Sequence, residues 1–158
     1  MLKINSILND CAKILSNYYI KSPKLDAEIL LSSVLKKSIK EMTFDDKINI
    51  NQKQLKLYRN LVTRRKYGEP VAYILNKKEF WKYNFYVDRN VLIPRPDTEI
   101  IIEETLKLLK KDEKKLVLDI GTGSGCIIIS LAKERSKLYG SAIDISKKAI
   151  KVAKINAK

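Results

Sequence analysis

The sequence predicts a mixed α/β protein, in which an N-terminal helical bundle precedes the opening β-α-β-α units of a doubly wound parallel sheet. Three observations support this fold class. Apolar residues recur at helical spacing over the first 75 residues. An aromatic-rich stretch at residues 78–87 interrupts that pattern, and short apolar runs alternate with helical segments from residue 116 onward. A length of 158 residues suits one domain or two small ones.

Three helices are expected in the first part. The apolar residues of the first helix lie three or four positions apart: Ile4, Ile7, Leu8, Cys11, Ile14, Leu15 and Tyr18. The second helix begins at Ser22-Pro23, an N-cap residue followed by proline at the first helical position. Asn51 caps the third helix, which stops before Gly68 and Pro70. Residues 38–50 form a loop or a short helix, so residues 1–75 are expected to be a helical domain.

The aromatic-rich stretch predicts a β-hairpin that links the two parts over residues 76–95. Residues 78–87 supply its strand residues, Asp88-Arg89-Asn90 is turn-like, and Val91-Leu92-Ile93 follows. The prolines of Pro94-Arg95-Pro96 end the hairpin.

Strands and helices alternate in the last part, residues 96–158. The expected elements are a helix over 100–110 capped by Asp97 or Thr98, a buried strand over 116–120, a helix over 126–133, a strand over 138–143, and a helix over 146–156 capped by Ser146. Two parallel strands with their helices cannot cover both faces and both edges of a sheet. We therefore expect an incomplete sheet in this chain, with a bare edge beside the strand at 116–120.

The charge is strongly basic, with a net value of +14, and has two interpretations. One is a nucleic acid or ribosome-associated partner. The other is composition alone, because lysine, isoleucine and asparagine are abundant together, as in A/T-rich coding sequence. Residues 1–95 carry a net charge of +10 and residues 96–158 one of +4, so a polyanion-facing surface is expected on the first part.

Several residue types exclude classes of chemistry. The sequence has no histidine, which excludes a histidine-based triad, general base or zinc site within it. Cys11 and Cys126 match no metal spacing and are expected to be free thiols. No apolar run approaches the length of a membrane span, and the first residues lead into an amphipathic pattern rather than a signal peptide. A cytoplasmic protein without a metal is therefore expected.

The motif that carries chemistry is Asp119-Ile120-Gly121-Thr122-Gly123-Ser124-Gly125, followed by Asp144 nineteen residues later. Glycines allow a tight turn from strand to helix and let a ligand lie against backbone N–H groups. An acidic residue at the tip of the second strand accepts hydrogen bonds from both hydroxyls of a ribose. Gly121, Thr122, Gly123, Ser124, Gly125, Asp144 and Asp119 are therefore the candidate cofactor-binding residues.

The glycine spacing separates two cofactors. Nicotinamide dinucleotides favour Gly-x-Gly-x-x-Gly, whose loop holds a pyrophosphate. Here the order is Gly-x-Gly-x-Gly with an aspartate two positions ahead, which suits S-adenosyl-L-methionine, a ribose-containing cofactor without phosphate. Asp119 would help there by binding the ammonium or holding the loop. A nicotinamide-dependent oxidoreductase remains the alternative within enzymes.

A second, rarer string is Ile93-Pro94-Arg95-Pro96-Asp97-Thr98-Glu99. It resembles the signature that precedes the methyltransferase domain in the PrmC/HemK family of protein-glutamine methyltransferases. The resemblance covers nearly the whole chain and includes, in the same order, Leu25-Asp26-Ala27-Glu28, Arg64-Arg65, Gly68-Glu69-Pro70, Glu79-Phe80-Trp81, the glycine loop and Ala142-Ile143-Asp144.

The resemblance implies a Rossmann-like methyltransferase domain and a function. Enzymes of this family transfer a methyl group from S-adenosylmethionine to the amide nitrogen of the glutamine in the Gly-Gly-Gln motif of class I peptide chain release factors. Residues 1–75 would then recognise the release factor, in translation termination, with no direct contact to DNA or to a membrane.

The sequence departs from the family pattern at one point. The family orients the glutamine amide with an Asn-Pro-Pro-Tyr segment, by positioning rather than acid–base catalysis, and no such string occurs here. No catalytic residue is therefore assigned. The 158 residues are expected to be inactive alone and to pair with a complementing C-terminal fragment; a non-catalytic module that binds a release factor or the ribosome is the alternative.

Other residues have two interpretations each. Phe80 and Trp81 either line the cofactor pocket or pack in a core between the domains. Cys126, at a helix N-terminus, is either an acidic thiol or a small packed residue. Arg59, Arg64 and Arg65 stand out among many lysines, and contact either phosphate, an acidic surface or only solvent.

Overall fold

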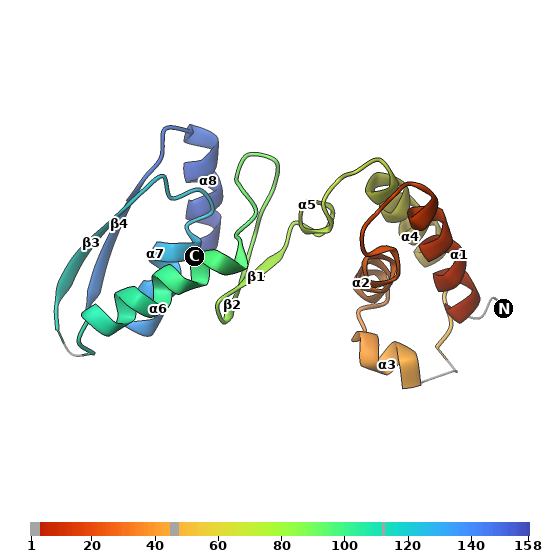
Figure 1. Ribbon diagram of the computed structural model, residues 1–158, viewed down its shortest axis with the longest axis horizontal. Helices are drawn as coiled ribbons and strands as arrows, with labels where there is room; N and C mark the ends of the chain where they lie inside the picture. Colours follow the sequence, from red (N-terminus) through yellow and green to blue (C-terminus); the bar gives the residue numbers. More distant parts are fainter. Residues whose placement is uncertain (1–3, 45–47, 112) are drawn as a thin grey trace. The chain divides into compact units, whose positions relative to one another are not determined.

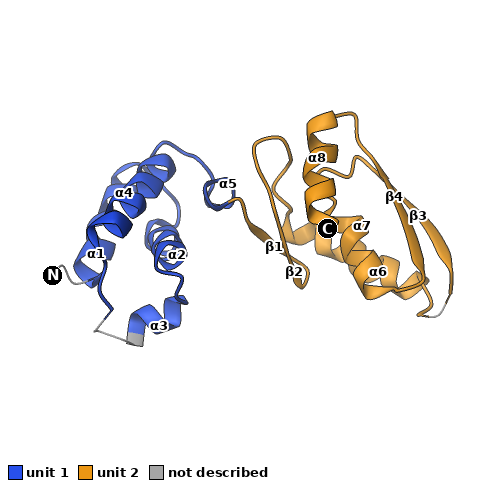
Figure 2. Ribbon diagram, turned by 180° about the vertical axis from the view of Figure 1, so that it is seen from behind, with its two compact units in different colours: residues 1–75 blue, residues 76–158 orange. Residues whose placement is uncertain are grey.

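The computed structural model of the chain describes residues 4–44, 48–111 and 113–158. The chain divides into two compact units, residues 1–75 and residues 76–158 (Figure 2). The described part of the first unit is helical, and the second combines helices with short strands (Figure 1). The predicted fold class is therefore confirmed.

The helices of the first unit enclose one hydrophobic core. They are α1 (Ile4–Asn17), α2 (Pro23–Leu35), α3 (Ile39–Phe44), α4 (Gln52–Lys66) and α5 (Val71–Leu75). Leu15, Leu30 and Tyr58 have no exposed surface and come from α1, α2 and α4. The Tyr58 hydroxyl donates a 3.2 Å hydrogen bond to the carbonyl of Ala27, and its burial raises the pKa of the phenol. The core thus joins helices that are distant in sequence.

The two predicted helix starts differ in their capping. Asn51 caps α4 as expected: its side chain accepts from the Gln54 N–H, and the Gln54 side chain accepts from the Asn51 N–H. Ser22 precedes α2, but its side chain makes no capping hydrogen bond. Pro23 still suits the start of α2, because its fixed φ matches the helix and its missing N–H costs no hydrogen bond.

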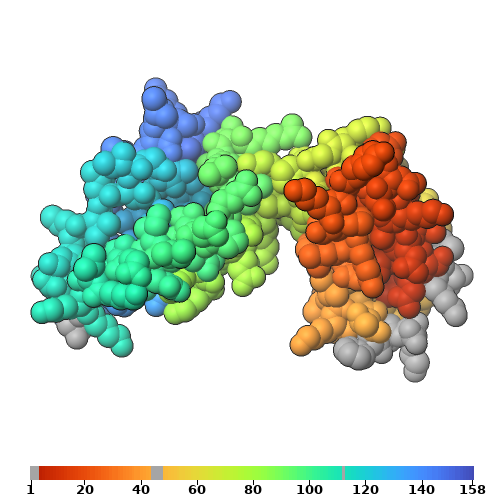
Figure 3. Space-filling model, in the orientation of Figure 1, coloured from red at the N-terminus to blue at the C-terminus, as the bar shows by residue number. Residues whose placement is uncertain are grey.

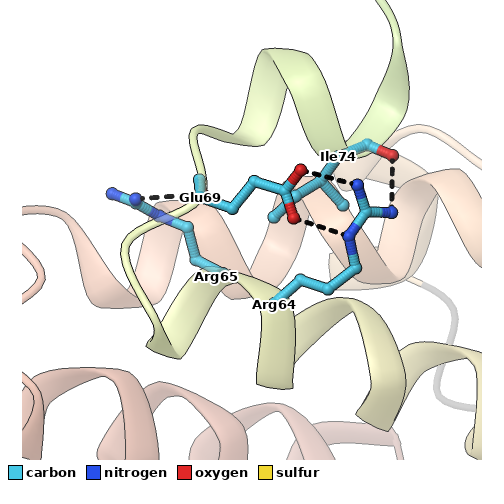
Figure 4. Close-up of polar contacts among 4 residues, drawn as sticks. All are labelled: Arg64, Arg65, Glu69 and Ile74. Atoms are coloured by element: carbon cyan, nitrogen blue, oxygen red, sulfur yellow. Dashed lines mark hydrogen bonds and ion pairs between the residues drawn. The ribbon is translucent and has the colours of Figure 1, made fainter. Parts of the chain in front are cut away.

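An ion-pair cluster holds the end of α4 to the following turn and to α5 (Figure 4). Arg64 donates from Nε and Nη2 to both carboxylate oxygens of Glu69, at 2.7 and 2.8 Å. Arg65 donates from Nε to Asp26 of α2 at 2.7 Å, and from Nη1 to the Glu69 carbonyl at 3.2 Å. Both arginines therefore bind groups of the protein itself. Arg59 instead lines a groove between α1 and α4.

The hairpin is shorter than predicted, and its turn lies elsewhere. β1 (Lys78–Phe80) pairs antiparallel with β2 (Tyr83–Phe85), so the turn is Trp81-Lys82 rather than residues 88–90. Val91-Leu92-Ile93 forms no strand. Trp81 has a φ of 58°, which is unusual for a non-glycine residue. Its N–H donates to Glu99 and its indole N–H to Glu134, and these two carboxylates stabilise the turn.

The helix after the hairpin begins slightly earlier than expected. A 3₁₀ turn η1 (Pro96–Thr98) leads into α6 (Glu99–Leu108), and Thr98 makes no side-chain capping bond. Arg135 supports the far end of α6 by donating to the carbonyls of Leu106 and Leu109. α6 packs along α7 (Cys126–Glu134). In the space-filling view, the green atoms of α6 lie at the front of the second unit (Figure 3).

β3 (Lys115–Ile120) and β4 (Leu138–Ile143) are parallel, as predicted, and Ile120 pairs with Ile143. α6, α7 and α8 (Lys147–Asn156) lie on one side of this pair (Figure 1). Among the described residues, the opposite face is open. The strand over 116–120 is therefore not buried as predicted, and the apolar side chains on this face are at least half exposed: Leu116, Leu118, Ile120, Tyr139 and Ile143. The expected incomplete sheet is therefore present. No helix of the described residues is long and apolar enough to cross a membrane.

Candidate cofactor-binding site

Parallel pairing brings the candidate residues to one edge of the sheet. The glycine loop follows β3 and Asp144 follows β4, and the two strands end side by side at Ile120 and Ile143. The N–H groups of Gly121 and Thr122 both donate to the carbonyl of Ile143, at 2.9 and 3.1 Å. The loop therefore starts directly against the end of β4.

Asp144 binds the middle of the glycine loop. Its Oδ2 accepts a 2.9 Å hydrogen bond from the Gly123 N–H, and its Oδ1 accepts a 2.8 Å bond from the Ser146 N–H. The Ser146 and Gly123 N–H groups lower the pKa of Asp144, so this carboxylate is charged at neutral pH. Each oxygen keeps a further lone pair, so the carboxylate can still accept hydrogen bonds from two vicinal hydroxyls.

Asp119 holds the loop from β3. Its Oδ2 accepts a 2.7 Å hydrogen bond from the hydroxyl of Thr122. Thr122 and Ser124 are both buried, and the side chain of Thr122 binds within the protein, to Asp119.

The glycines of the loop have two different surroundings: Gly123 faces open space, and Gly125 packs closely against two helices. Gly121, Gly123 and Gly125 have φ values of 79°, 55° and 80°. A Cβ on Gly123 would meet no described atom within 4 Å, so the loop has open space above this residue. A Cβ on Gly125 would lie 2.8 Å from the Ile129 side chain and 3.3 Å from that of Ala153. Gly125 therefore lets the loop pack closely against side chains of both α7 and α8.

Asn156, the last residue of α8, joins this region but was not among the sequence candidates. Its side chain bonds with the backbone of Tyr86, after β2, and with the carbonyl of Ser124 in the glycine loop. The sequence carries no local signal for this role, because the partners lie 70 and 32 residues away.

The remaining candidates have structural contacts. Burial raises the pKa of the Cys126 thiol, which is the opposite of an acidic, reactive cysteine. Phe80 is buried against Phe85, with ring centroids 6.1 Å apart, inside the core of the second unit. Trp81 donates its indole N–H to Glu134.

Cys11 and Cys126 are both free and buried. Among the described residues, no three His, Cys, Asp or Glu side chains form a metal-binding group.

Two family models match the chain. The PrmC N-terminal domain matches residues 6–75, and a methyltransferase domain matches residues 111–158. The first match falls within the helical unit, and the second contains β3, the glycine loop and Asp144.

Named relatives agree with these matches. The release factor glutamine methyltransferase of Coxiella burnetii is 49% identical over 138 residues, which are 87% of this chain and 50% of that protein. The protein of the same name from Buchnera aphidicola subsp. Schizaphis graminum is 41% identical over 155 residues, 98% of this chain and 55% of that protein. A bifunctional methyltransferase of Rickettsia bellii is 37% identical over 180 aligned positions, covering 98% of this chain and 32% of that protein.

The chain spans about half the length of the release factor glutamine methyltransferases that it matches. The resemblance noted from the Ile93–Glu99 string and the glycine loop thus extends to both parts of the sequence. On these matches, the chain belongs to the PrmC family of methyltransferases.

Proposed function

We propose that the protein binds S-adenosylmethionine and serves in the methylation of the Gly-Gly-Gln glutamine of a class I peptide chain release factor. The observation that carries the proposal is the hydrogen bond between Asp144 and the Gly123 N–H, which joins an acid suited to bind ribose to a glycine loop at the carboxyl edge of parallel strands. The type of reaction is inferred from family membership and from the names of the relatives.

The residues present fit this cofactor. Asp144 would accept hydrogen bonds from the two ribose hydroxyls with the lone pairs that Gly123 and Ser146 leave unused. The open space above Gly123 lets a ligand lie against the loop backbone. Asp119 would act mainly through Thr122, by holding the loop in place. When bound, S-adenosylmethionine supplies an electrophilic methyl group on its sulfonium.

Residues 1–75 are proposed to recognise the release factor. This unit has its own core and carries 14 basic and seven acidic side chains, so it can attract an acidic surface. Binding to the release factor is therefore expected to weaken as salt rises from 50 to 300 mM, because exposed charges are screened. A pull-down across this range tests the expectation. Unchanged binding after residues 1–75 are deleted would contradict the role of this unit.

The test of the reaction uses the protein that carries this sequence, methyl-labelled S-adenosylmethionine and a class I release factor. Label is expected in the release factor, and replacement of its Gly-Gly-Gln glutamine by glutamate should abolish the incorporation. Calorimetric titration with NAD in parallel addresses the oxidoreductase alternative. Tighter binding of NAD than of S-adenosylmethionine would overturn the proposed cofactor.

A further inference from the structure

Asn156 connects three elements through one side-chain amide. Its Oδ1 accepts a 2.7 Å hydrogen bond from the N–H of Tyr86, and its Nδ2 donates at 2.9 Å to the carbonyl of the same residue. The second Nδ2 hydrogen is donated to the Ser124 carbonyl at 2.8 Å. Figure 1 shows the segment after β2 beside α8, where these bonds form.

All three partners are backbone groups, and among amino-acid side chains only the amide of asparagine has the length and the donors and acceptor to bind all of them. The paired N–H and carbonyl of Tyr86 require one acceptor and one donor, and Ser124 requires a second donor. Aspartate has the same size but lacks both donors. Glutamine has the donors but is one methylene longer.

The Ser124 bond fixes a peptide plane inside the glycine loop. The carbonyl of Ser124 is held by Asn156, while the N–H of Gly125, in the same peptide unit, donates to the Thr122 carbonyl at 2.8 Å. Ala153, one turn before Asn156 on α8, packs against Gly125. α8 therefore holds the end of the loop, while Asp144 and the Ile143 carbonyl hold its beginning and middle.

We propose that Asn156 is a positioning residue of the cofactor site, which keeps the glycine loop and the segment at Tyr86 in the binding arrangement before the cofactor arrives. The inference rests on the proposed binding of S-adenosylmethionine. A loop that is already ordered loses less conformational entropy on binding, so the bonds of Asn156 contribute to affinity as well as to stability.

The test compares Asn156→Asp and Asn156→Ala with the original protein and with Ile155→Ala, a matched control at an exposed neighbouring position. Calorimetric titration with S-adenosylmethionine is done at 25 °C, and thermal unfolding confirms that each variant is folded there. Both Asn156 variants are expected to weaken binding about tenfold, the effect of one lost hydrogen bond, while Ile155→Ala binds normally. Folded Asn156 variants that bind as tightly as the original protein would overturn the inference.

A measurement on the unaltered protein keeps the inference testable if the variants do not fold. The N–H groups of Gly125 and Tyr86 should be protected from hydrogen exchange before S-adenosylmethionine is added. Rapid exchange that becomes slow only with cofactor would mean that the loop is not ordered beforehand, and would contradict the role of Asn156. Absence of S-adenosylmethionine binding by the original protein would instead overturn the proposed function, and the inference with it.

Discussion

At the scale of single residues, the ion pair between Asp26 and Arg65 lies where water has little access. The two side chains are 12% and 18% exposed, and their atoms approach to 2.7 Å. The sequence alone leaves open whether Arg65 contacts phosphate, an acidic surface or solvent, and the structure pairs it with Asp26 of the same unit. The two residues join α2 to the end of α4, from which the turn at Glu69 leads to α5.

Replacing Asp26 by alanine is expected to lower the free energy of unfolding by about 3 kcal/mol, because it leaves the Arg65 guanidinium partly buried without its partner. Asp10→Ala, at an exposed position of α1, should change stability by less than about 0.5 kcal/mol. Urea unfolding followed by circular dichroism measures both. Equal effects of the two substitutions would show that the pair is not important for the first unit.

Asp144 allows a residue-scale prediction about binding. Asp144→Asn keeps the size of the side chain but removes its charge and replaces one acceptor oxygen by a donor, which then faces the N–H of Gly123 or Ser146. Affinity for S-adenosylmethionine is expected to fall by about tenfold or more, with the loss of at least one charge-assisted hydrogen bond. Glu103→Gln, on the exposed face of α6, is the control. Calorimetry that finds the same affinity for both variants would remove Asp144 from the site.

The sequence predicted which residues meet at the strand ends, but not everything that holds them. Parallel strands of similar length necessarily bring the loop after the first and the acid after the second to one edge, so the contact of Gly123 with Asp144 follows from the pattern. The contacts of Asn156 depend on how α8 packs against a segment 70 residues away. No local periodicity or motif carries that information.

At the scale of elements, the hairpin turn shows what binary patterning misses. The run from Lys78 to Val87 lacks an Asn-Gly or Asp-Gly turn, so the sequence favours a turn at Asp88-Arg89-Asn90. Hydrogen bonds from other elements override this preference, because Glu99 and Glu134 stabilise Trp81 in a left-handed conformation.

Pro70 has a second role besides the predicted one of ending α4. Its carbonyl accepts hydrogen bonds from the N–H groups of Tyr73 and Ile74, which begin α5.

Glu134 at the end of α7 is expected to make this hairpin sensitive to acid. It accepts hydrogen bonds from Trp81 and Tyr83 and pairs with Lys82 at 3.0 Å; the contacts with Lys82 and Trp81 contribute most to lowering its pKa below the usual value of 4.5. A lowered pKa in the folded state means that the stabilisation is present above the unfolded pKa and is lost as pH falls through the folded one.

Stability of the second unit is therefore expected to fall as the pH drops below about 4.5, and Glu134→Gln should reduce the slope of that fall. The measurement is urea unfolding at a series of pH values, followed by the fluorescence of Trp81, the single tryptophan of the sequence. Glu103→Gln, which removes an exposed carboxylate, should leave the slope unchanged. If the Glu134 variant and this control share one pH profile, the hairpin contacts do not depend on the charge of Glu134.

At the scale of the whole molecule, each unit has a separate set of buried contacts. One hydrophobic cluster contains buried residues from Ile4 to Ile74, and another contains residues from Phe80 to Leu131. The order of helices before alternating strands and helices was enough to predict this change of architecture. No local pattern in the sequence identifies the partners in the ion pairs that stabilise the end of the first unit.

Residues 1–75 are expected to fold on their own. Their buried side chains pack within one cluster, and the Tyr58–Ala27 hydrogen bond and the Asp26–Arg65 ion pair also lie within this range. A peptide of these residues is therefore expected to be helical by circular dichroism. It should unfold cooperatively in urea with a stability of about 3–5 kcal/mol, as is typical of a core of this size.

Tyr58→Ala supplies the decisive comparison for this peptide. The side chain is fully buried among α1, α2 and α4, and its removal leaves a cavity and takes away the hydroxyl that donates to the Ala27 carbonyl, at a cost of about 3–5 kcal/mol. This loss equals the expected stability of the whole peptide, so the variant should be unfolded at 25 °C. Leu57→Ala, at a half-exposed position of the same helix, should remain folded. A gradual loss of helix in the original peptide, or equal melting of the two variants, would mean that the helices of the first unit depend on residues beyond 75.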